Sequence, residues 1–103
     1  MLRLHWAPKA YEDLDEIQRF IQEDNPEAAA QVVLHIIDRA EQLRAFPESG
    51  PLLPVKRWPH DTMRSLVVGS HIVFYRADDV FVSVIRVLHA ARDYMSILKA
   101  EAI

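Results

Sequence analysis

The 103-residue chain has no cysteine and only two glycines, Gly50 and Gly69. Without cysteine it can form neither a disulfide framework nor a thiolate zinc site, and it has no thiol nucleophile. Two isolated glycines cannot build the phosphate-binding loop of a P-loop or dinucleotide-binding motif. No apolar run is long enough to cross a bilayer, and charge interrupts the N-terminus too early for a signal-peptide core. We therefore expect a cytoplasmic protein with no bound cofactor.

The sequence also contains no motif typical of a metal site or of a catalytic serine. The histidines show no short ligand pair such as HExxH, so the sequence predicts no metal site. No serine lies in a nucleophile-elbow motif. The five histidines are His5, His35, His60, His71 and His89.

The composition is that of one folded domain covering residues 1–103, since two cores would each be undersized. Hydrophobic residues make up 50% of the chain and charged residues 26%. The net charge of −3 is uneven, with 5 Lys and Arg against 10 Asp and Glu in residues 1–50, and 7 against 5 in residues 51–103. A pI of about 5.9 is far below that of a typical nucleic-acid binder. We expect no sequence-specific nucleic-acid binding by this chain alone.

The N-terminal half has the pattern of one strand followed by two helices. Residues 2–6 alternate apolar and polar, as a half-buried strand does. Apolar residues then recur every three or four positions over residues 8–23, and again from residue 26 to about residue 45. Asn25-Pro26 ends the first helix and begins the second, so the two should form an antiparallel hairpin.

Two features of the first predicted helix carry expectations. Its acidic residues should complement the helix dipole near the N-terminal end, and its apolar stripe should belong to the core. The acidic residues are Glu12, Asp13, Asp15 and Glu16, and the stripe consists of Tyr11, Leu14, Ile17 and Ile21.

The C-terminal half has the pattern of three strands. Three prolines and a glycine make residues 46–54 a loop. Segments rich in Val, Ile, Phe and Tyr follow at residues 63–68, 71–76 and 81–88, with a type II′ turn expected at Gly69-Ser70. Residues 93–100 should form a short terminal helix or tail. The fold class is therefore α+β, in the order βααβββ, with an antiparallel sheet covered on one face by the N-terminal helix hairpin.

Four stretches in this order resemble those of the ParE/RelE toxins, and the resemblance covers nearly the whole chain from Trp6 to Leu98. They are residues 7–17 (APKAYEDLDEI), 25–29 (NPEAA), 46–50 (FPESG) and 86–93 (RVLHAARD). Each is weak alone, but together they are specific for the superfamily. The ParE-like branch is favoured.

The resemblance implies the toxin of a type II toxin-antitoxin pair. Such a toxin is held inactive by an antitoxin, ParD-like or related, that wraps a helix and an extended tail around it. RelE-like toxins are ribosome-dependent mRNA endonucleases, whereas ParE-like toxins poison DNA gyrase. Growth arrest and plasmid stabilisation are associated with these systems.

The residues themselves favour the ParE-like branch. Cleavage of RNA needs a base, an acid and cations at the phosphate. RelE-like members commonly place arginine near the positions of Ile72 and Ala90, where this chain has aliphatic side chains. We therefore favour no catalytic residues. An alternative nuclease site would consist of Arg64, Arg86, His89, Arg92 and Tyr94.

Two surfaces are predicted for partners. Large apolar residues in or beside the proline-rich loop should either pack on the domain's own sheet or receive the amphipathic helix of the antitoxin. The apolar C-terminal segment should pack on the sheet or present a target-binding surface to gyrase. A third hypothesis is an inactive toxin kept as an antitoxin-binding module. The antitoxin-binding candidates are Leu52, Leu53, Val55 and Trp58, and the target-binding candidates are Tyr94, Ile97 and Leu98.

Overall fold

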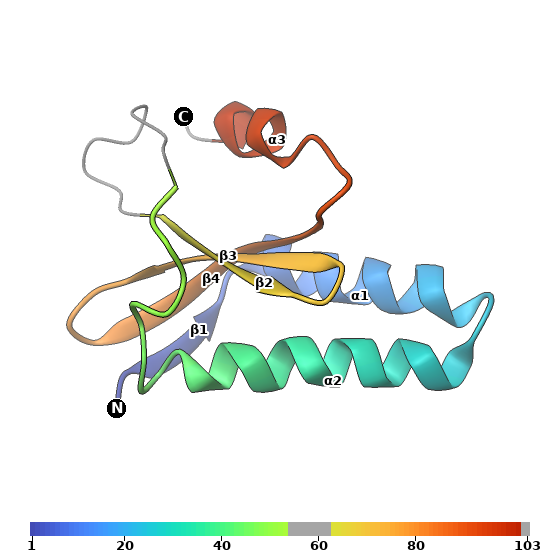
Figure 1. Cartoon of the computed structure of the whole chain (residues 1–103), viewed down its shortest axis with the longest axis horizontal. Coiled ribbons are helices and arrows are strands. Elements are labelled where there is room, and N and C mark those ends of the chain that lie inside the picture. The colour runs from blue at the N-terminus through green and yellow to red at the C-terminus, as the bar shows by residue number, and fades with distance from the viewer. Residues whose placement is uncertain (54–62, 102–103) are drawn as a thin grey trace.

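The computed structural model describes residues 1–53 and 63–101. A four-stranded sheet carries a helix hairpin on one face and a short C-terminal helix on the other (Figure 1). The elements are β1 (Arg3–Trp6), α1 (Pro8–Gln22), α2 (Pro26–Gln42), β2 (Arg64–Val68), β3 (His71–Ala77), β4 (Phe81–His89) and α3 (Tyr94–Glu101). This confirms the α+β class and the predicted order of elements, and the terminal segment is a helix.

The sheet is mixed, where we expected an antiparallel one. Its strand order is β1-β4-β3-β2, and β1 runs parallel to β4 with Leu4 opposite Val82. Alternating polarity identifies a half-buried strand but says nothing about the direction of its partner. A parallel pair needs a long connection, and here the two helices and two other strands lie between β1 and β4. The hairpins β2–β3 and β3–β4 are antiparallel as predicted.

The turns follow the local sequence. Gly69 has φ +60°, and no other described residue has a positive φ, so the two-residue β2–β3 loop has the single left-handed position of the predicted type II′ turn. At the β3–β4 turn, Asp78 Oδ1 accepts from the N–H groups of Phe81 (2.7 Å) and Val80 (2.8 Å), which lowers the pKa of the Asp78 carboxyl. The Gly69 turn and the hydrogen bonds of Asp78 set the register of the two hairpins.

The helix boundaries also follow the predicted signals. Pro8 and Pro26 lie in the first turns of α1 and α2, and the side chain of Asn25 accepts from Ala28 N at 3.1 Å. The acidic residues expected near the N-terminal end of α1 come after its first turn, which contains none. The acidic run begins one turn later, and one of its members, Asp13, is buried at 4% exposure.

Two apolar clusters fill the two faces of the sheet. The larger lies under α1 and α2 and includes Leu14, Ile36 and Tyr75. The smaller lies under α3 and includes Phe74 and Leu98. The predicted stripe of α1 is only partly core, since Leu14 is buried and Ile17 and Ile21 are half-buried, but Tyr11 is 60% exposed. Helix α1 therefore has more apolar surface than the sheet covers.

The loop after α2 is held to the sheet by one buried hydroxyl. Tyr75 Oη donates to Pro47 O at 2.8 Å and accepts from Gly50 N at 2.9 Å. Burial raises the pKa of the Tyr75 hydroxyl, so it stays protonated and keeps its donor. A Cβ at Gly50 would meet Ser65 O at 2.3 Å, so only glycine lets the loop approach β2 this closely.

Among the described residues, no helix is long and apolar enough to cross a membrane.

Replacing Tyr75 with phenylalanine tests this attachment. Tyr75→Phe leaves the buried Gly50 N–H without its acceptor, and we expect it to lower the free energy of unfolding by about 1–3 kcal/mol in urea denaturation. Tyr11→Phe is the matched control, because Tyr11 is exposed, and should change stability by less than about 0.5 kcal/mol. Equal effects of the two substitutions would contradict this role of Tyr75.

Candidate functional site

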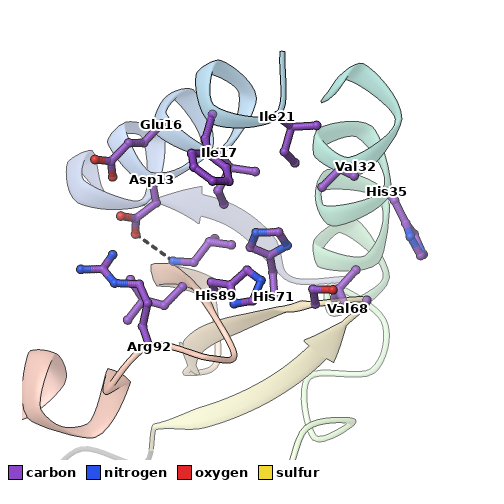
Figure 2. Close-up of a pocket in the computed structure, with 15 residues that line it drawn as sticks. Asp13, Glu16, Ile17, Ile21, Val32, His35, Val68, His71, His89 and Arg92 are labelled. Atoms are coloured by element: carbon purple, nitrogen blue, oxygen red, sulfur yellow. Dashed lines mark hydrogen bonds between the residues drawn. The ribbon is translucent and has the colours of Figure 1, made fainter. Parts of the chain in front are cut away.

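A pocket of about 750 Å³ lies between the helix hairpin and one end of the sheet, and we call it the hairpin pocket. Its walls come from α1, α2, the β2–β3 turn and the end of β4 (Figure 2). It is lined by Asp13, Glu16, Ile17, Phe20, Ile21, Val32, His35, Val68, Gly69, Ser70, His71, Val87, Leu88, His89 and Arg92. Its volume and its mixture of apolar walls and a few polar groups are typical of a binding site.

The hairpin pocket exists because the helices are longer than the sheet. Helix α1 has 15 residues and α2 has 17, so they span roughly 22–26 Å. Their connected ends extend past the β2–β3 turn (Figure 1). Ile17 and Ile21 of α1 and Val32 of α2 point toward the opening from the helical side (Figure 2). These apolar side chains are therefore only half-buried.

Two histidines lie together on the sheet side of the pocket. His71 and His89 are directly opposite each other on β3 and β4, and their ring centroids are 5.2 Å apart in an edge-to-face arrangement (Figure 2). Burial lowers the pKa of His71, and the neighbouring His89 lowers it further. Ala91 N donates to His89 Nδ1 at 3.0 Å. In the neutral His89 ring the proton is therefore on Nε2, which acts as a donor.

Beside the hairpin pocket, α1 is joined to β4 by a buried ion pair. Arg86 Nε donates to Asp13 Oδ2 at 2.7 Å, and Arg86 Nη2 donates to Asp13 Oδ1 at 2.8 Å. The side chains are 10% and 5% exposed. This bidentate contact raises the pKa of Arg86. The guanidinium is therefore committed to a structural partner.

Asp13 also completes the edge of the sheet. Strand β1 pairs with β4 only as far as Trp6 opposite Val84, because Pro8 begins α1 directly afterwards. The N–H of Val87, further along β4, donates to Asp13 Oδ2 at 2.9 Å (Figure 2). A side-chain carboxylate thus satisfies a backbone donor beyond the end of the neighbouring strand.

The same arginine anchors the C-terminal helix. Arg86 Nη1 contacts Glu101 Oε1 at the end of α3, and Lys9 Nζ lies 3.2 Å from the same oxygen. Phe74 and Tyr94 pack with ring centroids 5.4 Å apart, and Leu98 is 2% exposed. Helix α3 is therefore attached to both α1 and the sheet.

The structure does not bring the alternative nuclease residues into one site. Only His89 and Arg92, both exposed, line the hairpin pocket. Arg86 is paired with Asp13, and Tyr94 packs on Phe74 under α3. Arg64 Nη1 donates to Gly50 O at 2.8 Å. In the sheet, Arg64 lies opposite Tyr75 and His89 lies opposite His71. Tyr75 and His71 are four positions apart on β3, so Arg64 and His89 are separated by about 13 Å along the strand direction.

The residues predicted to contact partners lie away from the hairpin pocket. Leu52 is 52% exposed and forms a bridge with Arg64, while Leu53 packs against the cluster under α3. Tyr94, Ile97 and Leu98 belong to that same cluster, of which Leu98 is the fully buried member. Val55 and Trp58 lie outside the described residues.

Sequence reasoning missed Asp13 and Glu101. Asp13 lies on the same helical face as Ala10 and Ile17, three residues after one and four before the other, so it is an acidic residue within an apolar stripe. A buried carboxylate needs a cationic or hydrogen-bonding partner. The position of Asp13 within the apolar stripe therefore indicated that it has such a partner. Glu101 had no such signal, because its partner is distant in sequence.

The hairpin pocket offers hydrogen-bond donors, one cation and two carboxylates around apolar walls, and one of the carboxylates, Asp13, is paired with Arg86. Arg92 and His89 stand on the sheet side, and Glu16 stands on α1. The described residues contain no group of three or more His, Asp or Glu that could hold a metal ion. The arrangement is suited to binding an amphipathic partner.

The buried imidazole gives stability a pH dependence. Because the pKa of His71 is below its usual 6.5 in the folded state, the unfolded chain binds more protons there, and stability should fall as pH drops below 6.5. Urea denaturation at about pH 7.5 and about pH 5.5 measures this loss. It should be smaller in His71→Asn and unchanged in His5→Asn, whose histidine is exposed. An undiminished loss in His71→Asn would contradict the assignment.

Comparison with known proteins agrees with the resemblance seen in the sequence. Y4kP of Sinorhizobium fredii is 33% identical over 98 residues, which cover 93% of this chain and 96% of the relative. Toxin RelE2 of Caulobacter vibrioides is 32% identical over 93 residues, covering 89% and 99%. In the solved chromosomal ParDE toxin-antitoxin system of P. aeruginosa, one chain is similar in fold, with a TM-score of 0.73 and 23% identity, covering 86% of this chain and 96% of that one.

The family itself follows from the match along the chain. The family model of the ParE toxin of the type II toxin-antitoxin system, parDE, matches residues 4–94, which extend from β1 to the start of α3. This match, together with the relatives Y4kP and toxin RelE2, confirms the predicted superfamily. The chain belongs to the ParE toxin family of type II toxin-antitoxin systems.

Proposed function

We propose that this toxin acts by binding and poisoning DNA gyrase, without catalytic chemistry of its own. The observation that carries the proposal is that Arg86, the only arginine on β4, is buried and bonded to two carboxylates. Its guanidinium is 10% exposed and is bonded to Asp13 and Glu101. A phosphate would have to displace two carboxylates and break the attachment of α1 and α3.

The rest of the nuclease set does not replace Arg86. Ile72, at a position where RelE-like toxins commonly have arginine, is buried among the apolar residues under α3. Stabilising the charge that develops in phosphoryl transfer requires cations aimed at one point. Arg64 lies on β2 and donates to Gly50 O, whereas Arg92 lies in the turn after β4 and lines the hairpin pocket. A toxin that only binds its target accounts for this surface better than one that cleaves RNA.

Neutralisation would come from the cognate antitoxin. Type II toxins function in pairs, and the P. aeruginosa relative was solved as such a system. Leu52, which is half-exposed beside β2, remains a candidate contact for the antitoxin. The exposed surface of α3 around Tyr94 and Ile97 remains a candidate contact for gyrase.

One observation favours ribosome-dependent mRNA cleavage as a second function. His89 and Arg92 face the same pocket, and an imidazole beside a guanidinium is a minimal acid-base pair for RNA. The 32% identity to toxin RelE2 is in keeping with this alternative. It requires His89 to act without Arg86.

Two assays on the purified toxin distinguish these functions. We expect inhibition of DNA supercoiling by purified gyrase, or trapped cleaved DNA, together with no cleavage of mRNA on translating ribosomes. The reason is that the surface presents binding groups without an assembled nuclease centre. His89→Ala should retain gyrase inhibition, because no part of that activity is assigned to His89.

Cleavage of mRNA with unaffected gyrase, abolished in His89→Ala, would replace the proposal with the RelE-like function. A folded toxin that binds its antitoxin but affects neither target would instead identify an inactive antitoxin-binding module. Addition of the antitoxin is the control for specificity, since it should reverse any genuine effect.

A further inference from the structure

Strand β1 is an edge of the sheet whose outer backbone groups face away from the other strands. It pairs with β4 on one side and has no neighbouring strand on the other among the residues that the structure describes. Arg3 N and Ala7 N donate toward β4 at 2.8 and 2.9 Å, so the intervening Leu4 and Trp6 direct their N–H and C=O groups outward. Outward backbone groups of this kind are a template for pairing with another strand.

The two edges of the sheet are covered unequally. Residues 51–53 lie along the start of β2, where Ser65 N donates to Pro51 O at 3.0 Å. Just before β1, Leu2 N donates to Arg44 O at 3.1 Å, and Leu2 O accepts from Arg44 Nε at 2.9 Å. The N-terminus therefore lies beside the end of α2 (Figure 1). This contact covers the edge at Leu2 and stops there.

The side chains at the outer edge of β1 are also incompletely covered. Leu4 and Trp6 lie opposite Val82 and Val84, which are 0% exposed, but are themselves only half-buried. The rings of Trp6 and Tyr11 have centroids 6.3 Å apart, and Tyr11 is 60% exposed. The apolar face of the sheet thus continues to the edge of β1, where a further strand would extend its cover.

The length of this edge restricts the strand that fits it. Arg44 occupies the edge at Leu2, and Pro8, which has no N–H, begins α1 two residues after Trp6. A strand that pairs here therefore has only Leu4 and Trp6 to pair with. If β1 of a second copy lies antiparallel with Leu4 opposite Trp6, each of these two pairs exchanges both backbone hydrogen bonds. Pro8 of one copy then lies opposite Leu2 of the other, where no further donor is needed.

We propose that two copies of this chain pair antiparallel through β1, with Leu4 of each copy opposite Trp6 of the other, so that their sheets become continuous. Leu4 and Trp6 pack toward the core under α1 and α2, so His5 points to the other face. The two His5 side chains then lie directly opposite each other on the two-fold axis. The pairing is independent of the proposed action on gyrase, and no residue of β1 lines the hairpin pocket.

A second copy fits this edge better than an unrelated extended peptide. Any peptide can supply backbone bonds, but a longer strand meets Arg44 at one end, whereas β1 itself turns into α1 at Pro8. The two-fold pairing also places the apolar Leu4 against Trp6. It places Arg3 of one copy opposite the uncharged Ala7 of the other, which keeps the two guanidinium groups apart.

Opposite charges at position 5 test this register directly. His5 is exposed, so His5→Lys and His5→Glu should leave the monomer folded, which circular dichroism checks. Each variant alone places like charges opposite each other in the dimer. We expect self-association to weaken by about threefold or more in sedimentation experiments over about a hundredfold range of concentration. An equal mixture of the two variants should restore dimers, because opposite charges then face each other across the axis.

Two further measurements separate this edge from the rest of the surface. His35→Lys and His35→Glu are matched controls, because His35 is exposed on α2 and lines the hairpin pocket. Alone or mixed, they should associate as the unaltered toxin does. Amide hydrogen exchange of Leu4 and Trp6, followed by NMR, should slow as the toxin concentration rises, because the pairing uses these two N–H groups.

The outcomes are distinct. Self-association that weakens in both His5 variants and returns in their mixture supports the pairing, whatever the gyrase assay shows. A toxin that stays monomeric at every concentration overturns it, and so does a dimer that His5→Lys leaves unchanged. Exchange at Leu4 and Trp6 that slows only when the antitoxin is added shows that the antitoxin occupies this edge, and it also overturns the pairing.

Discussion

The buried ion pair between Arg86 and Asp13 determines how the layers of this protein fit together. It fixes α1 on β4, and the same carboxylate accepts the Val87 N–H beyond the end of β1. Through Glu101 the same guanidinium also attaches α3, which covers the other face of the sheet. Breaking a buried pair by removing one partner costs about 3–5 kcal/mol, so both helical layers depend on a single arginine.

This structural use of Arg86 bears on function. The guanidinium is bonded to two carboxylates, those of Asp13 and Glu101, whereas His89 and Arg92 line the hairpin pocket. The helix hairpin meanwhile extends past the sheet and leaves apolar side chains at the hairpin pocket. Both features are the basis of the proposal that this member of the ParE toxin family acts by binding its target.

Local sequence signals predicted the elements well because each depends on near neighbours. Asn25-Pro26 separates the two helices, and Gly69 forms the β2–β3 turn, as predicted. Contacts between residues distant in sequence could not be predicted, and the parallel pairing of β1 with β4 is one of them. Another is the ion pair between Arg86 and Asp13, which are 73 residues apart. Arg86 was a candidate for the alternative nuclease site, and in the structure it belongs to this ion pair. Likewise, the stripe of α1 identified an apolar face but not how much of it the sheet would cover.

The most direct test of this account is growth arrest by the double variant D13N/R86Q, expressed without antitoxin. Replacing both charges leaves two amides that can still hydrogen-bond. Arg86→Gln alone leaves the buried Asp13 carboxylate without its cation, and Asp13→Asn alone leaves Arg86 with Glu101 as its remaining carboxylate. We predict that the double variant is more stable than either single variant and still arrests growth, because the proposed action on the target does not use the Arg86 guanidinium. A double variant that folds, by circular dichroism, but no longer arrests growth would show that Arg86 acts on the target and would contradict the account.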